Sequence, residues 1–165
     1  MRAIFCYNYS KFFISHRLPL LKKIKLNFSE IVFLGNVLNQ ESLFLKKNVD
    51  FAFDTKISKG SLNIFKLIKY ILIFPYKRLR KRNYFHLIEI ATLKGLLIAL
   101  PIIYRNQDAK IVFWICGLGT IFLSNKFHHK IIRFFLIKIY AYIYKNFNTS
   151  WIFENHDDKN FFQKN

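Results

Sequence analysis

Acidic residues are scarce in this chain of 165 residues. Asp and Glu together number 9 against 27 Lys and Arg, which gives a formal net charge of +18. Such a charge attracts polyanions, whether nucleic acid, anionic lipid headgroups or phosphorylated substrates. A codon bias toward Lys, Ile, Asn and Phe would raise the lysine content without any selection for binding, but it would not account for so few acids. The charge therefore favours a functional basic surface.

Cysteine is equally sparse, because Cys6 and Cys116 are the only two in the chain. Each lies beside apolar residues in a stretch of strand character. Two such residues indicate buried free thiols in a reducing compartment, and they argue against a disulfide framework or a cysteine metal site.

Long apolar runs are missing too. The run at residues 3–7 is too short for a signal peptide. The longest stretch without a charge, residues 111–125, falls short of the roughly 18–20 residues that a spanning helix needs. We therefore expect a cytoplasmic chain that is not integral to a membrane.

What the chain does have is apolar and aromatic residues, at 53% and 19% of the sequence, which excludes disorder. Neither a linker nor an internal repeat interrupts it, so we expect a single domain over residues 1–165, long enough to bury a core. Strand-length apolar runs alternate with longer helical patterns, which is typical of βαβ units. The expected strands are residues 3–7, 31–34, 51–53, 85–88, 111–115 and 151–153, and the expected helices are residues 18–26, 41–47, 62–81, 93–104 and 128–146.

This pattern predicts an α/β fold, namely a Rossmann-like parallel sheet with helices on both faces. The loops after Tyr7, Ile88 and Ile115 should open on a single edge of that sheet.

Two of the expected helices are strongly basic. The helix over residues 62–81 ends in a run that includes Lys77, Arg78 and Arg80, and the helix over residues 128–146 follows a pattern that places Lys126, Lys130 and Arg133 on one face beside aromatic residues. A solvated helix end or face explains such residues adequately. The sharper hypothesis is that these six residues contact phosphates or an anionic membrane surface, to which the chain would attach peripherally.

Three short stretches carry most of the functional information. The first is residues 13–20, Phe-Ile-Ser-His-Arg-Leu-Pro-Leu, which follows the first strand. Ser15 suits a helix cap and Pro19 suits the first turn, so His16 and Arg17 would stand at the positive end of the helix and could meet a phosphate. The simpler interpretation is a capping serine with incidental polar neighbours.

The second stretch is residues 116–124, in which Gly117-Leu118-Gly119 would let a ligand approach the backbone closely. It is not a dinucleotide fingerprint, because the position of the third glycine holds Phe122. No Walker-type loop and no nucleophile with a partnered base is visible, so we expect no cofactor and assign no catalytic residue.

The third stretch is residues 151–162, Trp-Ile-Phe-Glu-Asn-His-Asp-Asp-Lys-Asn-Phe-Phe. Asp157 and Asp158 are explained as residues that cap a short helix. Together with His156 they could in principle bind a metal ion, but three adjacent residues rarely converge on one ion. We expect no metal site.

The order and spacing of these stretches resemble the amino-terminal half of family 4 glycosyltransferases, in the group that acts on lipid-linked glycans. The resemblance implies the acceptor-side domain of a GT-B fold, with Ser15, His16, Arg17, Gly117, Leu118 and Gly119 at the acceptor. It implies a polyprenyl-diphosphate-linked glycan as the acceptor. The nucleotide-sugar donor would be held by a second domain or subunit that follows such a half, so we expect these 165 residues alone to be inactive in transfer.

The chain departs from the wider family at Cys116, where many members have a His that faces the acceptor. His86 matches another position where the family often has His, but a lone His on an apolar strand is more often a packed core residue. Two alternatives stay open. The first is a basic α/β module that binds nucleic acid, for which no RNP-like, KH or helix-turn-helix pattern is present. The second is a membrane-associated subunit without catalysis.

Overall fold

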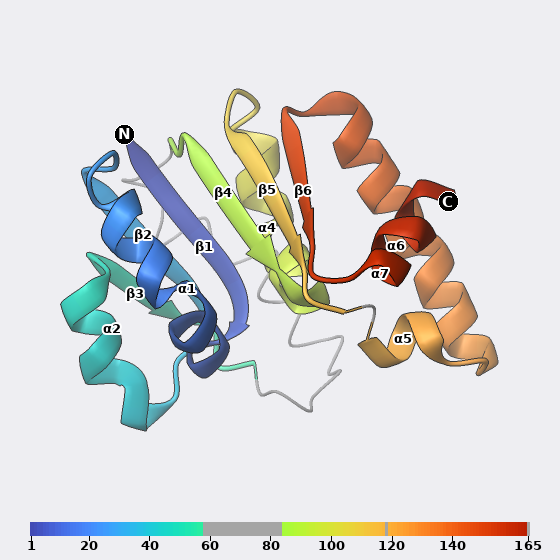
Figure 1. Cartoon of the computed structure of the whole chain (residues 1–165), viewed down its shortest axis with the longest axis horizontal. Helices are drawn as coiled ribbons and strands as arrows, with labels where there is room; N and C mark the ends of the chain where they lie inside the picture. Colours follow the sequence, from blue (N-terminus) through green and yellow to red (C-terminus); the bar gives the residue numbers. More distant parts are fainter. Residues whose placement is uncertain (58–83, 118, 165) are drawn as a thin grey trace.

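A six-stranded parallel sheet forms the centre of the computed structural model, which describes residues 1–57, 84–117 and 119–164. Every pair of neighbouring strands is parallel, and the strand order is β3-β2-β1-β4-β5-β6 (Figure 1). This order is the Rossmann order, so the expected α/β fold is confirmed. The strands are β1 (Arg2–Tyr9), β2 (Glu30–Asn36), β3 (Phe51–Asp54), β4 (Leu87–Ala91), β5 (Lys110–Ile115) and β6 (Thr149–Phe153).

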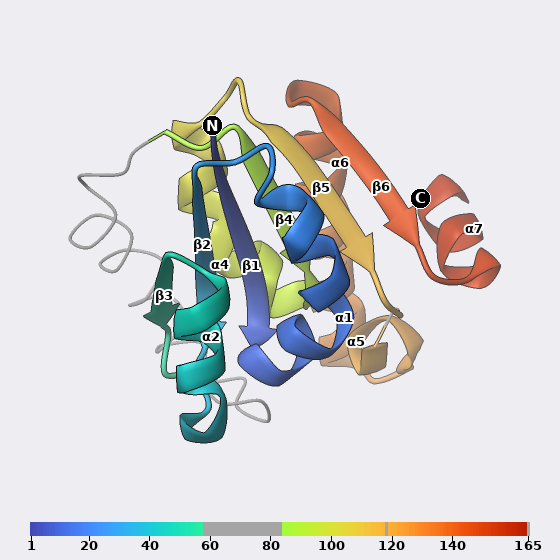
Figure 2. The ribbon, with the colours of Figure 1, turned by 60° about the vertical axis from the view of Figure 1, so that its left-hand side comes forward.

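Helices lie on both faces of the sheet (Figure 2). Those on one face are α1 (Ser10–Ile24) and α2 (Ser42–Asn48), the latter preceded by a 3-10 turn, η1 (Asn39–Glu41). On the other face lie α4 (Thr92–Arg105) and α6 (Phe127–Asn146). Two short helices, α5 (Gly119–Leu123) and α7 (His156–Lys164), follow β5 and β6. The helix expected over residues 62–81 lies outside the described residues, and so do Lys77, Arg78 and Arg80.

Each face of the sheet has its own hydrophobic core, because successive side chains of a strand point to opposite faces. In β1, Phe5 packs with Phe13 of α1, whereas the next residue, Cys6, belongs to the core beneath Leu96 of α4. Helix α4 approaches β1 closely at Gly95, where a Cβ atom would lie 2.4 Å from the carbonyl oxygen of Cys6. The glycine is what permits this contact.

The strand order places a topological switch point between β1 and β4. From β1 the sheet continues through β2 to β3 in one direction, and from β4 it continues through β5 to β6 in the other. In open parallel sheets, ligands bind in the crevice outside the carboxyl ends of the strands at this point. The carboxyl ends of β1, β4 and β5 lie at that edge, as expected. A register shift between Cys6 and Tyr9 interrupts the pairing of β1 with β2 there. The loops expected after Tyr7 and Ile88 are absent, because both residues lie within their strands and α1 and α4 follow β1 and β4 directly, whereas a loop does follow Ile115.

Helix α1 begins at Ser10, eight residues before the predicted start at residue 18, so the prediction for its first turn was wrong. Ser15 is not a helix cap. It lies within the helix and donates a hydrogen bond from its Oγ to the carbonyl oxygen of Phe12 at 3.1 Å. Pro19 is also inside α1, where it lacks the N–H that would otherwise donate a hydrogen bond to the carbonyl oxygen of Ser15. His16 and Arg17 therefore do not stand at the amino end of the helix.

The fourth strand lies later than predicted, at Leu87–Ala91, because the N–H of Phe85 is bonded to Asn106 Oδ1 at 2.6 Å and not to a neighbouring strand. His86 consequently precedes β4 and is exposed at the opposite edge from the crevice. Its Nδ1 accepts the N–H of Arg2 at 3.1 Å. The expectation of a packed core histidine was wrong, and its position also removes His86 as an acceptor-facing residue.

Candidate functional site

A buried ion pair joins α1 to the sheet beside the switch point. Arg17 Nε lies 2.6 Å from Glu89 Oε1, and the two side chains are 2% and 4% exposed. The same carboxylate oxygen accepts a hydrogen bond from the Tyr7 hydroxyl. Glu89 is held in β4 and Tyr7 in β1, so the three side chains bridge the two strands that flank the switch point.

Trp114 covers the guanidinium of Arg17. The Cζ atom of Arg17 lies 3.4 Å from the centroid of the Trp114 ring, which is close stacking geometry. Trp114 belongs to β5, and its indole Nε1 donates a hydrogen bond to Glu154 Oε1 at 2.8 Å. Glu154 directly follows β6, so this chain of contacts runs along the carboxyl edge from β1 to β6.

Two of the sequence stretches singled out above meet directly in this cluster, because Arg17 comes from residues 13–20 and Glu154 comes from residues 151–162. Trp114 stands two residues before the second stretch, whose first residue, Cys116, lies close enough to Glu154 and Arg17 that both act on its pKa. Residues separated by more than 130 positions are thereby brought together by two direct contacts, Arg17 with Trp114 and Trp114 with Glu154. Residues that are far apart in the sequence thus lie close together in the fold.

Among the described residues, two buried polar atoms of this part of the fold lack a hydrogen-bond partner. One is Arg17 Nη2, a donor, and the other is Asn8 Oδ1, an acceptor near the end of β1. Both atoms are buried, and a buried polar atom without a partner costs about 1–3 kcal/mol. A bound water molecule or ligand would satisfy these two atoms.

Two ionisable groups of the cluster, the Cys116 thiol and the Tyr7 phenol, have pKa values that favour their neutral forms. Burial, reinforced by the charge of Glu154, raises the pKa of Cys116 to about 12, and Arg17 opposes this shift. Burial and the Glu89 carboxylate raise the pKa of Tyr7 well above its ordinary value. Neither the thiol nor the phenol is therefore ionised near neutral pH, so neither is a ready nucleophile. The cluster is suited to binding more than to covalent catalysis.

The loop after β5 has the backbone freedom that the sequence predicts. Gly117 has φ +133° and Gly119 has φ +66°, and both lie in the region that side chains rarely adopt. A Cβ atom at either position would meet no heavy atom within 4 Å. The space beside these glycines is therefore open to a ligand, whereas Leu118 lies outside the described residues.

The start of α1 is tied to the segment that follows β2 by Ser10. Its buried hydroxyl accepts the N–H of Leu38 at 3.0 Å and donates a hydrogen bond to the Glu41 carboxylate. Ser10, not Ser15, is thus the serine that organises the start of α1.

The structure separates the predicted acceptor residues of α1. Arg17 points inward to the cluster, whereas Ser15 and His16 are exposed, and His16 Nδ1 lies 2.7 Å from Ser15 Oγ. The roles assigned to Ser15, His16, Arg17, Gly117, Leu118 and Gly119 stay predictions.

Sequence reasoning missed the centre of the site. Glu89 carried a signal, since it is the one acid within the apolar run of β4, and Tyr7 and Trp114 looked like ordinary strand aromatics.

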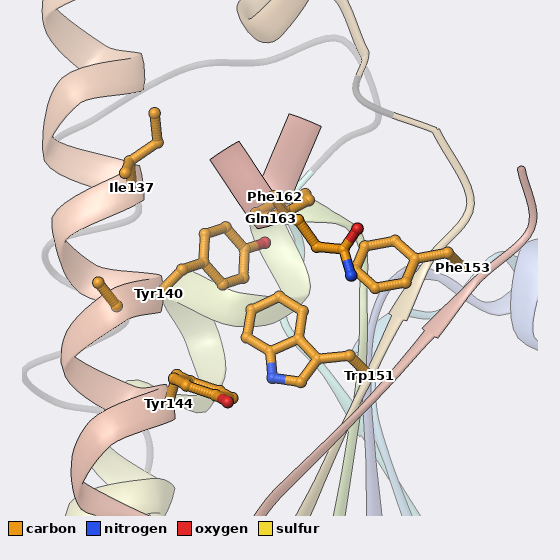
Figure 3. A pocket seen from close by; sticks show the side chains of 8 residues that line it. Ile137, Tyr140, Tyr144, Trp151, Phe153, Phe162 and Gln163 are labelled. Atoms are coloured by element: carbon orange, nitrogen blue, oxygen red, sulfur yellow. The ribbon is translucent and has the colours of Figure 1, made fainter. Parts of the chain in front are cut away.

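A separate pocket of about 500 Å³ lies at the β6 end of the sheet. Figure 3 shows aromatic rings from α6, β6 and α7 around it, with the amide of Gln163 on one side. The Tyr140 and Trp151 rings lie 5.4 Å apart between centroids and are tilted by 56° to each other. None of the predicted site residues lines this pocket, whose lining is Ile137, Tyr140, Ala141, Tyr144, Trp151, Phe153, Phe162 and Gln163.

The basic residues predicted at the start of α6 have different surroundings. Lys126 and Lys130 are exposed, but Arg133 is half-buried and donates a hydrogen bond from Nη1 to the Phe122 carbonyl of α5. Arg133 therefore holds α5 against α6. Among residues 1–57, 84–117 and 119–164, no helix is long and apolar enough to cross a bilayer.

At the start of α7, Asn155 Oδ1 accepts the N–H of Asp158 at 2.8 Å, and the Asp158 carboxylate accepts a hydrogen bond from the Asn155 amide. The capping residue is thus Asn155. Within the described part of the chain, no group of three His, Cys, Asp or Glu residues is arranged to hold a metal ion.

The fold and the cluster define a Rossmann-like α/β protein with a polar site at its switch point. No known family model matches the chain, and no curated protein is significantly similar to it.

Proposed function

We propose that this chain binds the acceptor of a glycosyl transfer, a polyprenyl-diphosphate-linked glycan, in the crevice at the carboxyl ends of β1, β4 and β5. The observation that carries the proposal is the convergence of Arg17, Trp114 and Glu154, because it joins the first and third of the stretches on which the resemblance to family 4 glycosyltransferases depends, beside Cys116 of the second.

Charge and geometry support an anionic, sugar-bearing ligand at this place. Arg17 offers Nη2, a charged donor with no described partner, which suits a phosphate oxygen. Gly117 and Gly119 leave open space beside the loop, which suits close approach of a sugar ring. Ser15 and His16, on the exposed side of α1, are placed to contact the ligand only where it extends over that helix.

The nucleotide-sugar donor is, in this proposal, held by a further domain or subunit. Transfer requires donor and acceptor to be held together, because much of the rate comes from positioning and from charge stabilisation at the leaving diphosphate. We place the chain in the cytoplasm, on the face of the membrane where a lipid-linked acceptor is accessible to nucleotide sugars.

The test is equilibrium binding of a short-chain polyprenyl-diphosphate monosaccharide in detergent, with the corresponding isoprenoid alcohol as the comparison ligand. The key variant is Gly119→Asn, because asparagine tolerates positive φ and the added Cβ atom would meet no heavy atom within 4 Å. We expect the variant to fold normally and to bind the diphosphate ligand roughly tenfold more weakly, a loss of about 1.4 kcal/mol.

The matched control is Lys56→Asn. Lys56 also has positive φ, 55°, but it follows β3 at the far side of the sheet from the β5 loop. The control removes a positive charge as well, so unchanged binding would show that the ligand does not respond to net charge alone. Equal binding of the alcohol and the diphosphate ligand, or equal affinity in Gly119→Asn and the native chain, would contradict the proposal.

A further inference from the structure

Helix α6 is apolar on two opposite sides. Its inner side, with Leu136, Tyr140 and Ile143, is buried in the core. On its outer side, Phe127 is 78% exposed and Phe135 is 61% exposed. A surface helix ordinarily has one apolar stripe, with polar residues on the opposite face. The second stripe therefore calls for an explanation other than the core.

The exposed residues form one continuous face. They recur at spacings of three and four residues, which places them along one side of a helix. We call this the outer face of α6, and it consists of Phe127, Ile131, Phe134, Phe135, Lys138, Tyr142 and Lys145. Over 20 residues the helix is roughly 30 Å long. Tyr104, from the end of α4, extends the face, since its ring lies 6.2 Å from that of Tyr142.

All the charges on this face are positive. No Asp or Glu occurs between Asp108 and Glu154, so neither α5 nor α6 contains an acid. Lys138 and Lys145 lie within the outer face, and Lys130 lies beside it. Lys138 Nζ is 5.5 Å from the Phe134 ring centroid, so the ammonium group is held beside an exposed ring. A large ring with a lysine next to it is the composition of an interfacial helix.

The positive charge of the outer face of α6 discriminates between the possible binding partners of this face. A second copy of the chain would bring another +18 against the same basic face, which disfavours self-association. Single-stranded nucleic acid binds in basic grooves with aromatic rings on which bases stack. The outer face of α6 is the convex side of a helix, and it includes the aliphatic Ile131. Apolar side chains interleaved with lysines match a lipid bilayer, which has anionic headgroups at its surface and apolar acyl chains beneath them.

We propose that the outer face of α6 docks on the surface of an anionic lipid bilayer. The helix lies in the plane of the headgroups, with Phe127, Ile131, Phe134, Phe135 and Tyr142 inserted toward the acyl chains. Lys130, Lys138 and Lys145 meet the lipid phosphates. Arg133 takes no part, because it is bound to α5. This proposal is independent of the acceptor-binding role.

The first test is sedimentation with vesicles of phosphatidylcholine alone and of phosphatidylcholine mixed with phosphatidylglycerol. We expect binding to the anionic vesicles and its loss at high salt. Lys138→Gln together with Lys145→Gln should weaken this binding roughly 30-fold, at about five-fold for each basic residue at the surface. The control is Lys46→Gln together with Lys47→Gln on α2, which removes the same charge from another exposed helix.

The second test addresses insertion of the rings. Phe134→Ser together with Phe135→Ser leaves the charge unchanged and should also weaken binding to the anionic vesicles by roughly tenfold or more, because each buried CH₂ contributes about 0.8 kcal/mol. Leu43→Ser is the control, since Leu43 is an exposed apolar residue of α2. Circular dichroism should show that every variant of both tests keeps its helix content, because all seven substituted positions are exposed.

Three outcomes would overturn the proposal. The first is equal loss of binding in the α2 and α6 charge variants, which would show that net charge alone acts. The second is equal binding to both kinds of vesicle at low salt. The third is tighter binding of single-stranded RNA, or a dimer in sedimentation velocity, that is abolished by the Phe134 and Phe135 substitutions, which would assign the face to another partner.

Discussion

Arg17 and Glu89, 72 residues apart in the chain, form a buried ion pair with 2.6 Å between Nε and Oε1. Helix α1 follows β1, and the pair fixes this helix against β4. The strand β4 lies across the switch point from β1. Because the Tyr7 hydroxyl donates to the same carboxylate oxygen, the pair also ties α1 to β1 through Glu89.

Breaking this pair should be costly. Arg17→Met leaves Glu89 buried without its cation, so we expect the free energy of unfolding to fall by about 3–5 kcal/mol in urea denaturation. Adding Glu89→Gln to this variant should recover part of the loss, because the buried charge is then removed. As a control, Arg2→Met breaks a pair of 3.8 Å between more exposed side chains and should cost about 1 kcal/mol or less. Further destabilisation by Glu89→Gln would contradict this account.

The Cys116 thiol should react slowly although it is only half-buried. Its pKa of about 12 leaves little thiolate below pH 9. Glu154→Gln removes a charge that raises this pKa, so alkylation of Cys116 at pH 9 should become faster, as measured by peptide-resolved mass spectrometry. Cys6 is fully buried and provides the unreactive internal control. A slower reaction in Glu154→Gln would show that the carboxylate does not act on the thiol.

The same shifts predict how stability depends on pH. Burial raises the pKa values of Cys6, Cys116, Tyr7 and Tyr140 in the folded chain. Between the ordinary thiol and phenol pKa values and these raised values, the folded state binds more protons than the unfolded state, so stability falls as pH rises. We expect the urea midpoint to be constant up to about pH 8 and to decrease above about pH 9. A midpoint that rises across this range would refute the assignment.

Gly95 offers a test of the contact between α4 and β1. Alanine has the higher helix propensity by about 1 kcal/mol, so Gly95→Ala would stabilise the chain if space allowed. The Cβ atom would instead lie 2.4 Å from the Cys6 carbonyl oxygen, and we expect a loss of about 1–3 kcal/mol. The sign of the change in thermal unfolding decides between the two.

Periodicity was sufficient to predict the strands and the sheet class, because buried parallel strands are continuous apolar runs. It failed at α1, where Ser15 and Pro19 imitate a helix start and the actual first residue, Ser10, bonds to another loop and not to its own helix. The site was only partly predictable for a similar reason. Arg17 was identified, but its partner Glu89 is brought to it by the strand order, and no local pattern encodes that contact.

The central claim is that the ligand binds where Arg17, Trp114 and Glu154 meet. The chain has two tryptophans, and each lies at a different candidate binding place. The indole N–H of Trp114 donates a hydrogen bond to Glu154 in the cluster, whereas Trp151 lines the pocket beside α6. Nitrogen-15 NMR of the two indole groups during titration with the polyprenyl-diphosphate monosaccharide therefore reports both places at once. We predict that the Trp114 resonance shifts with ligand concentration while that of Trp151 stays in place. A shift of Trp151 alone, or of neither resonance, would contradict the account.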